Sequence, residues 1–208
     1  MSDLPPEYDD DDYDFPLPSE AGLFLEIINE QEEIVIEEDR IRNVCEKILA
    51  DAGITSGRLG IVIVDNETIH NLNKDFLQHD YPTDVISFQV ESEPENGYLE
   101  GEVIVSAEMA LSRAPEFSWS VKEELILYVI HGLLHLVGFD DGTAEECKII
   151  REKERYYLRH AGFEPNDLGF EFEMESEPES GSASETTPPL EEKENFFLRV
   201  YDKDAEIN

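Results

Sequence analysis

Positive charge is scarce in this sequence, which has 15 Lys and Arg residues against 51 Asp and Glu residues. A protein that binds nucleic acid normally presents a basic surface, because neutralising phosphates and releasing counterions supplies most of the affinity. The composition therefore counts against a broad nucleic-acid-binding surface. Any contact with phosphates has to be local.

Cysteine and long apolar runs are also scarce. The two cysteines, Cys45 and Cys147, lie far apart, and the first residues have neither the basic nor the apolar region of a secretory signal. We therefore expect reduced thiols in a cytoplasmic protein. No apolar run reaches the roughly 18 residues that a membrane span requires, so no membrane partner is expected.

Acidic residues are concentrated at both ends of the chain. Residues 1–20 contain 8 acids and no base, and residues 164–208 contain 14 acids and 3 bases. Such segments cannot bury enough apolar surface to offset the entropy lost on ordering. We predict a disordered tail at 1–21, one folded domain at 22–163 and a second disordered tail at 164–208. Within the second tail, only NFFLRVY (195–201) has the character of a docking segment or a loose edge strand.

The middle of the chain alternates strand-like and helix-like patterns without an internal repeat. Apolar spacing predicts helices at 37–53, ending at Gly53, and from 66 to about 80, with Asn66 as the N-cap. Runs rich in β-branched residues predict strands at 23–29, 33–37, 58–65, 84–90 and 101–108. This order predicts an α+β fold, with a small mixed sheet of about four strands and helices packed on it.

A further helix at 120–138 carries the residues of most chemical interest. Ser120 and Glu123 form a capping-box pattern at its start, and Gly138 is typical of a helix C-terminus. His131 and His135 are four positions apart, so their side chains lie on one face, roughly 6 Å apart along the axis. The helix is apolar enough to be central in the fold.

Two histidines in an apolar stripe are consistent with structural core residues or with metal ligands. Gly138 and Asp141 follow at the offsets of the metzincin pattern His-Glu-x-x-His-x-x-Gly-x-x-His, which favours a zincin-like helix and one metal ion. The third ligand is then Asp141 or Asp140. Zn²⁺ suits two imidazoles and a carboxylate, although nickel and iron accept the same ligand types.

The segment HGLLHLVGFDD, together with LNKDFLQHDYPTDVISF and GEVIVS, resembles the YbeY family of bacterial metal-dependent endoribonucleases over most of residues 22–163. The resemblance implies hydrolysis of single-stranded RNA in rRNA maturation and small-subunit quality control. Its implied partners are rRNA and the small ribosomal subunit, and not DNA. It places the metal ligands at His131, His135 and Asp141, the last in place of the family's usual histidine.

The chain departs from the family at Phe76 and Leu77, where a Tyr-Arg pair is common. Another group then has to stabilise the phosphate charge, and the candidates are Lys74, Arg58 or the metal itself, with His79 as a further phosphate contact or an acid. The general base is not identified by sequence, and its candidates are Asp84, Asp140 and Glu102. In PTDVISF, Thr83 and Asp84 either orient a ligand or substrate or bond the local turn, and Ser87 should face away from Ile86 and Phe88.

Three functions remain consistent with the sequence. The first is the metal-dependent endoribonuclease. The second is a zinc hydrolase or protease of metzincin-like geometry, against which Gly132 counts because it occupies the position of the general-base Glu. The third is a ribosome-assembly or RNA-binding factor with a structural zinc site. Bases in the last helix form either a local RNA-binding face or an ordinary solvated surface with ion pairs: Lys148, Arg151, Lys153, Arg155 and Arg159.

Overall fold

A computed structural model describes residues 22–165 of the chain. The predicted tail at 1–21 and the predicted second tail from residue 166 on, including NFFLRVY, lie outside the described residues, so the domain boundaries remain predictions. The elements in chain order are β1 (Leu23–Asn29), α1 (Glu38–Asp51), β2 (Ser56–Val64), α2 (Asn66–Leu77), β3 (Val85–Glu93), η1 (Pro94–Asn96), β4 (Tyr98–Ser106), α3 (Ala107–Arg113), η2 (Ala114–Phe117), α4 (Val121–Leu136) and α5 (Ala144–His160).

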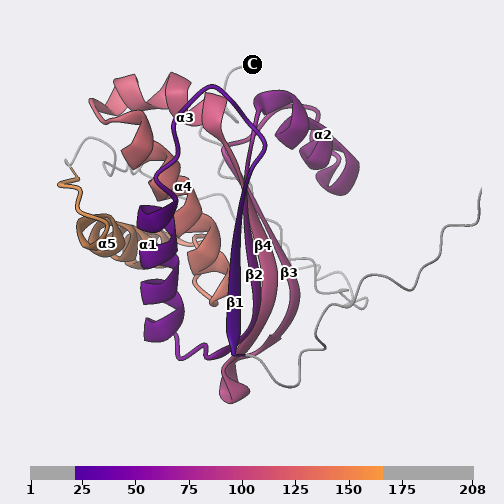
Figure 1. The fold of residues 1–208 in the computed structure, drawn as a ribbon, viewed down its shortest axis with the longest axis vertical. Helices are drawn as coiled ribbons and strands as arrows, with labels where there is room; N and C mark the ends of the chain where they lie inside the picture. Colours follow the sequence, from indigo (N-terminus) through magenta and orange to yellow (C-terminus); the bar gives the residue numbers. More distant parts are fainter. Residues whose placement is uncertain (1–21, 166–208) are drawn as a thin grey trace, which may run out of the picture.

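The four strands form one mixed sheet in the order β1-β2-β4-β3. Strands β1, β2 and β4 are parallel, and β3 joins the edge of β4 in the antiparallel direction. Helices α1, α4 and α5 lie on one side of the sheet, and α2 lies on the other side near one end (Figure 1). The predicted α+β class, mixed sheet and central two-histidine helix are confirmed.

The main core lies between the sheet and the three helices on its first side. Alternate residues of β2 and β4, such as Leu59, Ile61 and Val103, are buried there against α1, α4 and α5. Helix α4 is buried along nearly its whole length, which explains why it is apolar on all sides. The opposite face of the sheet has a smaller apolar cluster under α2, formed by Val64, Ile69, Ile86 and Ile104.

Two local predictions are wrong. Residues 33–37 form no strand, because the Gln31 side chain accepts from the Ile34 N–H and donates to the Ile34 carbonyl, which closes a turn. Helix α2 is capped by Asp65 and not by Asn66, since the Asp65 carboxylate accepts from the Thr68 N–H at 2.8 Å. Gly53 ends α1 as predicted, at a φ of 75°. Within residues 22–165, no helix combines the length and the apolar character needed to cross a bilayer.

Candidate metal centre

The centre is built on the C-terminal turns of α4 and on the sharp turn that follows. The Ser120 hydroxyl accepts from the Glu123 N–H at 3.2 Å, which confirms Ser120 as the N-cap. Gly138 adopts a φ of 96°, as a residue without a side chain readily does, and it turns the chain toward α5. This turn brings Asp141 back to the histidine face of α4.

The ligand atoms of His131, His135 and Asp141 all lie within 4.8 Å of one another. The two Nε2 atoms are 3.0 Å apart, and the Nε2 of His131 is 3.9 Å from Oδ2 of Asp141. His131 is buried, with 4% of its surface exposed, whereas His135 and Asp141 are half-buried at the rim. The three side chains converge on one small space that opens toward solvent.

The outer nitrogens of both rings fix the tautomer. Nδ1 of His131 is 2.7 Å from Oε1 of Glu154, and Nδ1 of His135 is 3.0 Å from the Phe139 carbonyl oxygen. A carboxylate and a carbonyl only accept, so both Nδ1 atoms carry the hydrogen. In neutral imidazoles the two Nε2 lone pairs then face each other at 3.0 Å, which is repulsive unless a proton or a cation lies between them. The donor set therefore fits a divalent metal ion.

Glu154 supports His131 from inside α5, and sequence reasoning missed it. The residue is 0% exposed, and its second oxygen accepts from Arg151 at 2.7 Å. Burial raises the pKa of this carboxyl, but the Arg151 guanidinium and the His131 ring outweigh that effect and lower the pKa overall. The signal in the sequence was the position of Glu154 on the stripe that includes Ile150 and Leu158, where an apolar side chain is expected.

The turn between α4 and α5 distinguishes the two neighbouring aspartates. Oδ1 of Asp140 accepts from the backbone N–H of Asp141 at 2.8 Å, so this carboxylate bonds its own turn. The Cys147 thiol donates to the Asp141 carbonyl at 2.9 Å and holds the turn from α5. Of the two candidates for the third ligand, the geometry groups Asp141 with the histidines.

At Gly132, α4 packs closely against the sheet. A Cβ at this position would lie 2.6 Å from Cγ1 of Val103, 2.8 Å from Oγ of Ser87 and 2.8 Å from Cγ2 of Val85. The Ser87 hydroxyl also donates to the Gly132 carbonyl at 3.0 Å, and Ser87 faces away from Ile86 as predicted. No glutamate fits here, so the general base of the metzincin pattern is excluded by packing as well as by sequence.

Replacing Gly132 with alanine is expected to lower the free energy of unfolding by about 1–3 kcal/mol, because overpacking against the sheet exceeds the roughly 1 kcal/mol gain in helix propensity. Urea denaturation measures the change. The double variant Gly132→Ala/Val103→Ala should recover part of the loss, because it removes the closest clash. Purely additive effects of the two changes would contradict this account.

Asp84 and Thr83 lie at the start of β3, beside the centre. Oδ1 of Asp84 accepts from the Thr83 hydroxyl at 3.1 Å and from the Val85 N–H at 2.9 Å, so the local-turn bonds are present. Burial raises the pKa of Asp84, while the nearby His131 ring opposes that rise. Asp84 is thus a buried carboxyl within electrostatic reach of a candidate ligand, with its pKa shifted toward neutral pH.

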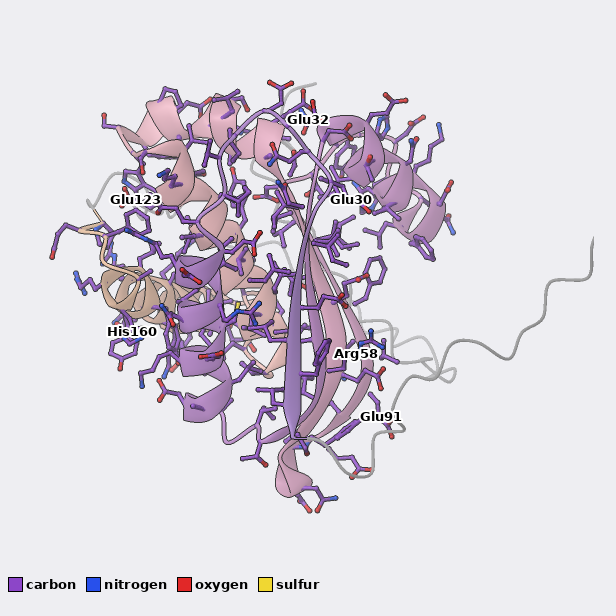
Figure 2. All side chains as sticks on the ribbon, viewed as in Figure 1. Glu30, Glu32, Arg58, Glu91, Glu123 and His160 are labelled. Carbon is purple, nitrogen blue, oxygen red and sulfur yellow. The ribbon has the colours of Figure 1, made fainter. Side chains whose placement is uncertain are left out.

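The other predicted contacts lie elsewhere. Arg58 is on the sheet face away from α4 and pairs with Glu26 at 3.6 Å; Figure 2 shows it across the sheet from α1 and α5. Glu102 shares that face and lies against Gly60. Lys74 contacts both carboxylate oxygens of Asp80 at 2.9 Å. None of these three is among the residues that meet at the histidines.

Two of the basic residues of α5, Arg151 and Lys153, make contacts with neighbouring side chains. Arg151 donates to Glu154, and Nζ of Lys153 lies 5.3 Å from the centroid of the Phe139 ring. These two cations stabilise the packing of α5 against the turn that carries Asp141. For Arg151 and Lys153, these contacts favour the interpretation of a helix held by local interactions over that of an RNA-binding face.

Comparisons with known proteins identify relatives of this chain. The family model described as "Endoribonuclease YbeY" matches residues 26–162. A protein named "Endoribonuclease YbeY" from Rhodopirellula baltica is 47% identical over 114 residues, which cover 54% of this chain and 58% of that relative. One of the same name from Salinibacter ruber is 36% identical over 148 residues, which cover 68% of this chain and 94% of the relative. The solution structure of TM1509 from Thermotoga maritima has a TM-score of 0.49 and 27% identity, over 66% of this chain and 89% of that one.

Proposed function

The chain belongs to the YbeY endoribonuclease family, and on this premise we propose that it is a metal-dependent hydrolase that cleaves phosphodiester bonds in single-stranded RNA. Its substrate is ribosomal RNA, and its setting is the cytoplasmic maturation and quality control of the small ribosomal subunit. Family membership supports the activity and the RNA substrate. The observation that carries the proposal is the convergence of His131, His135 and Asp141.

The ligand set that we propose is His131, His135 and Asp141, and the metal that we propose is one Zn²⁺ ion. When bound, the ion supplies Lewis acidity toward a phosphoryl oxygen and lowers the pKa of a water molecule. Glu154 and the Phe139 carbonyl hold the two imidazoles in the tautomer that presents Nε2 to this ion. The carboxylate of Asp141 adds a negative charge, which weakens that Lewis acidity relative to a third imidazole.

Asp84 is the residue that we propose for proton transfer. Of the candidate carboxyls, Asp84 is the one that is both buried and within electrostatic reach of His131. Asp140 is exposed and bonds the backbone of its own turn, and Glu102 lies on the other sheet face. Thr83 then acts as a positioning residue, because its hydroxyl donates to Asp84.

Removal of the metal tests this function directly. We expect chelator-treated protein to lose cleavage of a single-stranded RNA substrate, and addition of stoichiometric zinc to restore it, while double-stranded RNA of the same sequence is cleaved poorly. Gel electrophoresis of labelled RNA gives the rate, and elemental analysis gives the metal content.

The fold should survive this treatment, because the main apolar core is formed by α1, α4, α5 and the sheet and does not require a metal. Circular dichroism of the chelated protein at the assay temperature is the control. Loss of secondary structure on chelation would instead indicate a structural metal. Cleavage that persists in metal-free protein would contradict the proposal.

A further inference from the structure

A loop between α2 and β3 carries two rings, and its backbone is held from inside the protein. Helix α2 ends at Leu77, and its C-cap residue Gln78 has a φ of 61°. The buried side-chain amide of Asn73 donates to the Tyr81 carbonyl at 2.8 Å, and the Asn73 carbonyl accepts from the His79 N–H at 3.3 Å. These bonds hold the backbone of the loop on both sides of Asp80, which lowers the entropy that the loop would lose when it binds a ligand.

His79 and Tyr81 stack on each other in this loop. Their ring centroids are 5.4 Å apart and their planes differ by 11°. Tyr81 is 38% exposed and His79 is also exposed, so much of the stack is in contact with solvent. Aromatic rings that are partly exposed at the surface can stack with an aromatic ring of a ligand.

The chain places this stack near the candidate metal centre. Val85 is four residues after Tyr81, and its Cγ2 would lie 2.8 Å from a Cβ at Gly132, the neighbour of His131. Four residues of chain span at most about 14 Å. A strand of a few nucleotides can therefore reach from the stack to the histidines.

The charges near the stack do not favour phosphate binding. Lys74, in the last turn of α2, is paired with Asp80, and Nε2 of His70 lies 2.9 Å from the same carboxylate. The whole chain has a formal net charge of −36. Affinity for RNA at this loop has to come from an interaction that does not depend on phosphate charge. Stacking of bases on aromatic side chains is such an interaction.

We propose that the His79–Tyr81 stack is a platform for an unpaired RNA base and that it positions the adjoining strand at the metal centre. This inference rests on the proposed function, because its ligand is the RNA that the centre cleaves. A base within a duplex is already stacked on its neighbours, whereas an unpaired base has open faces. The platform therefore contributes to selection of single-stranded RNA.

Binding of a short, labelled single-stranded oligoribonucleotide tests the platform, with a chelator present so that the RNA is not cleaved. Tyr81→Ala should weaken binding about tenfold. The slope of log affinity against log salt should stay unchanged, because no phosphate contact is lost. Tyr81→Trp should bind as well as the wild type. Tyr156→Ala is the matched control, since Tyr156 is an exposed ring (48%) on α5.

A second probe replaces one base of the oligonucleotide with 2-aminopurine, whose fluorescence is quenched on stacking. We expect the wild type to quench the fluorescence and Tyr81→Ala not to quench it. An abasic site in place of the 2-aminopurine should weaken binding by the wild type. The platform is wrong, and the proposed function stands, if the wild type cleaves RNA, Tyr81→Ala binds RNA at full strength, and the wild type binds abasic RNA at full strength. If metal-loaded wild type neither binds nor cleaves RNA, both fail.

Discussion

Replacing His135 with alanine is expected to lower RNA cleavage at least about 100-fold and to abolish stoichiometric metal binding. His135 supplies one of the two imidazole nitrogens that lie 3.0 Å apart. Without it, only His131 and Asp141 remain as ligands, whereas a catalytic zinc ion takes three protein ligands. The side chain lies at the rim and not in the main core, so the variant should remain folded.

The measurement pairs elemental analysis with single-turnover cleavage, so that metal loss and rate loss are observed in the same sample. His160→Ala is the matched control, because His160 is an exposed histidine at the end of α5. We expect it to retain both metal and activity. A His135→Ala protein that is folded, free of metal and still fully active would contradict the proposed role of the centre.

Replacing Glu154 with glutamine is expected to affect both stability and metal affinity. Glu154 bonds His131 at 2.7 Å and Arg151 at 2.7 Å while fully buried. Loss of one partner from a buried ion pair costs about 3–5 kcal/mol, and the value here should be near the lower end because Arg151 retains some exposure. Loss of a carboxylate that orients a ligand should weaken metal affinity about 10- to 100-fold.

The two effects can be separated with a second substitution. In Glu154→Gln/Arg151→Met the uncompensated guanidinium is gone, so the free energy of unfolding should recover, but metal affinity should remain low because His131 still lacks its carboxylate. Glu152→Gln, an exposed change on the same helix, is the control for loss of one negative charge. Recovery of metal affinity in the double variant would show that Glu154 acts on stability alone.

The predictions that were confirmed depend on residues close together in the chain. The cap at Ser120, the C-terminal turn at Gly138 and the shared face of His131 and His135 each follow from the geometry of one helix. The strand at 33–37 was wrong because a side-chain-closed turn at Gln31 overrides β-propensity, and Asn66 was misassigned by one position.

Contacts between residues of different helices and strands could not be predicted from these short-range patterns. Glu154 meets His131 although 23 positions separate them. Arg58 was a candidate for phosphate contact, yet the two-residue period of β2 places it on the sheet face away from α4. Asp84 was one of three candidate carboxyls in the sequence, and its burial near His131 is what distinguishes it from Asp140 and Glu102.

The amino-acid sequence by itself determined the α+β class, the central helix and the shared face of its two histidines, because helical periodicity and a glycine turn are short-range geometry. The choice of Asp141 over Asp140 as the residue that meets the histidines came from the structure. Only the tertiary structure decided that Glu154 orients His131, that Gly132 is required by close contact with the sheet, and that Arg58 lies away from the site. Those outcomes depend on which faces of the sheet and helices meet, and this is set by packing of the whole core.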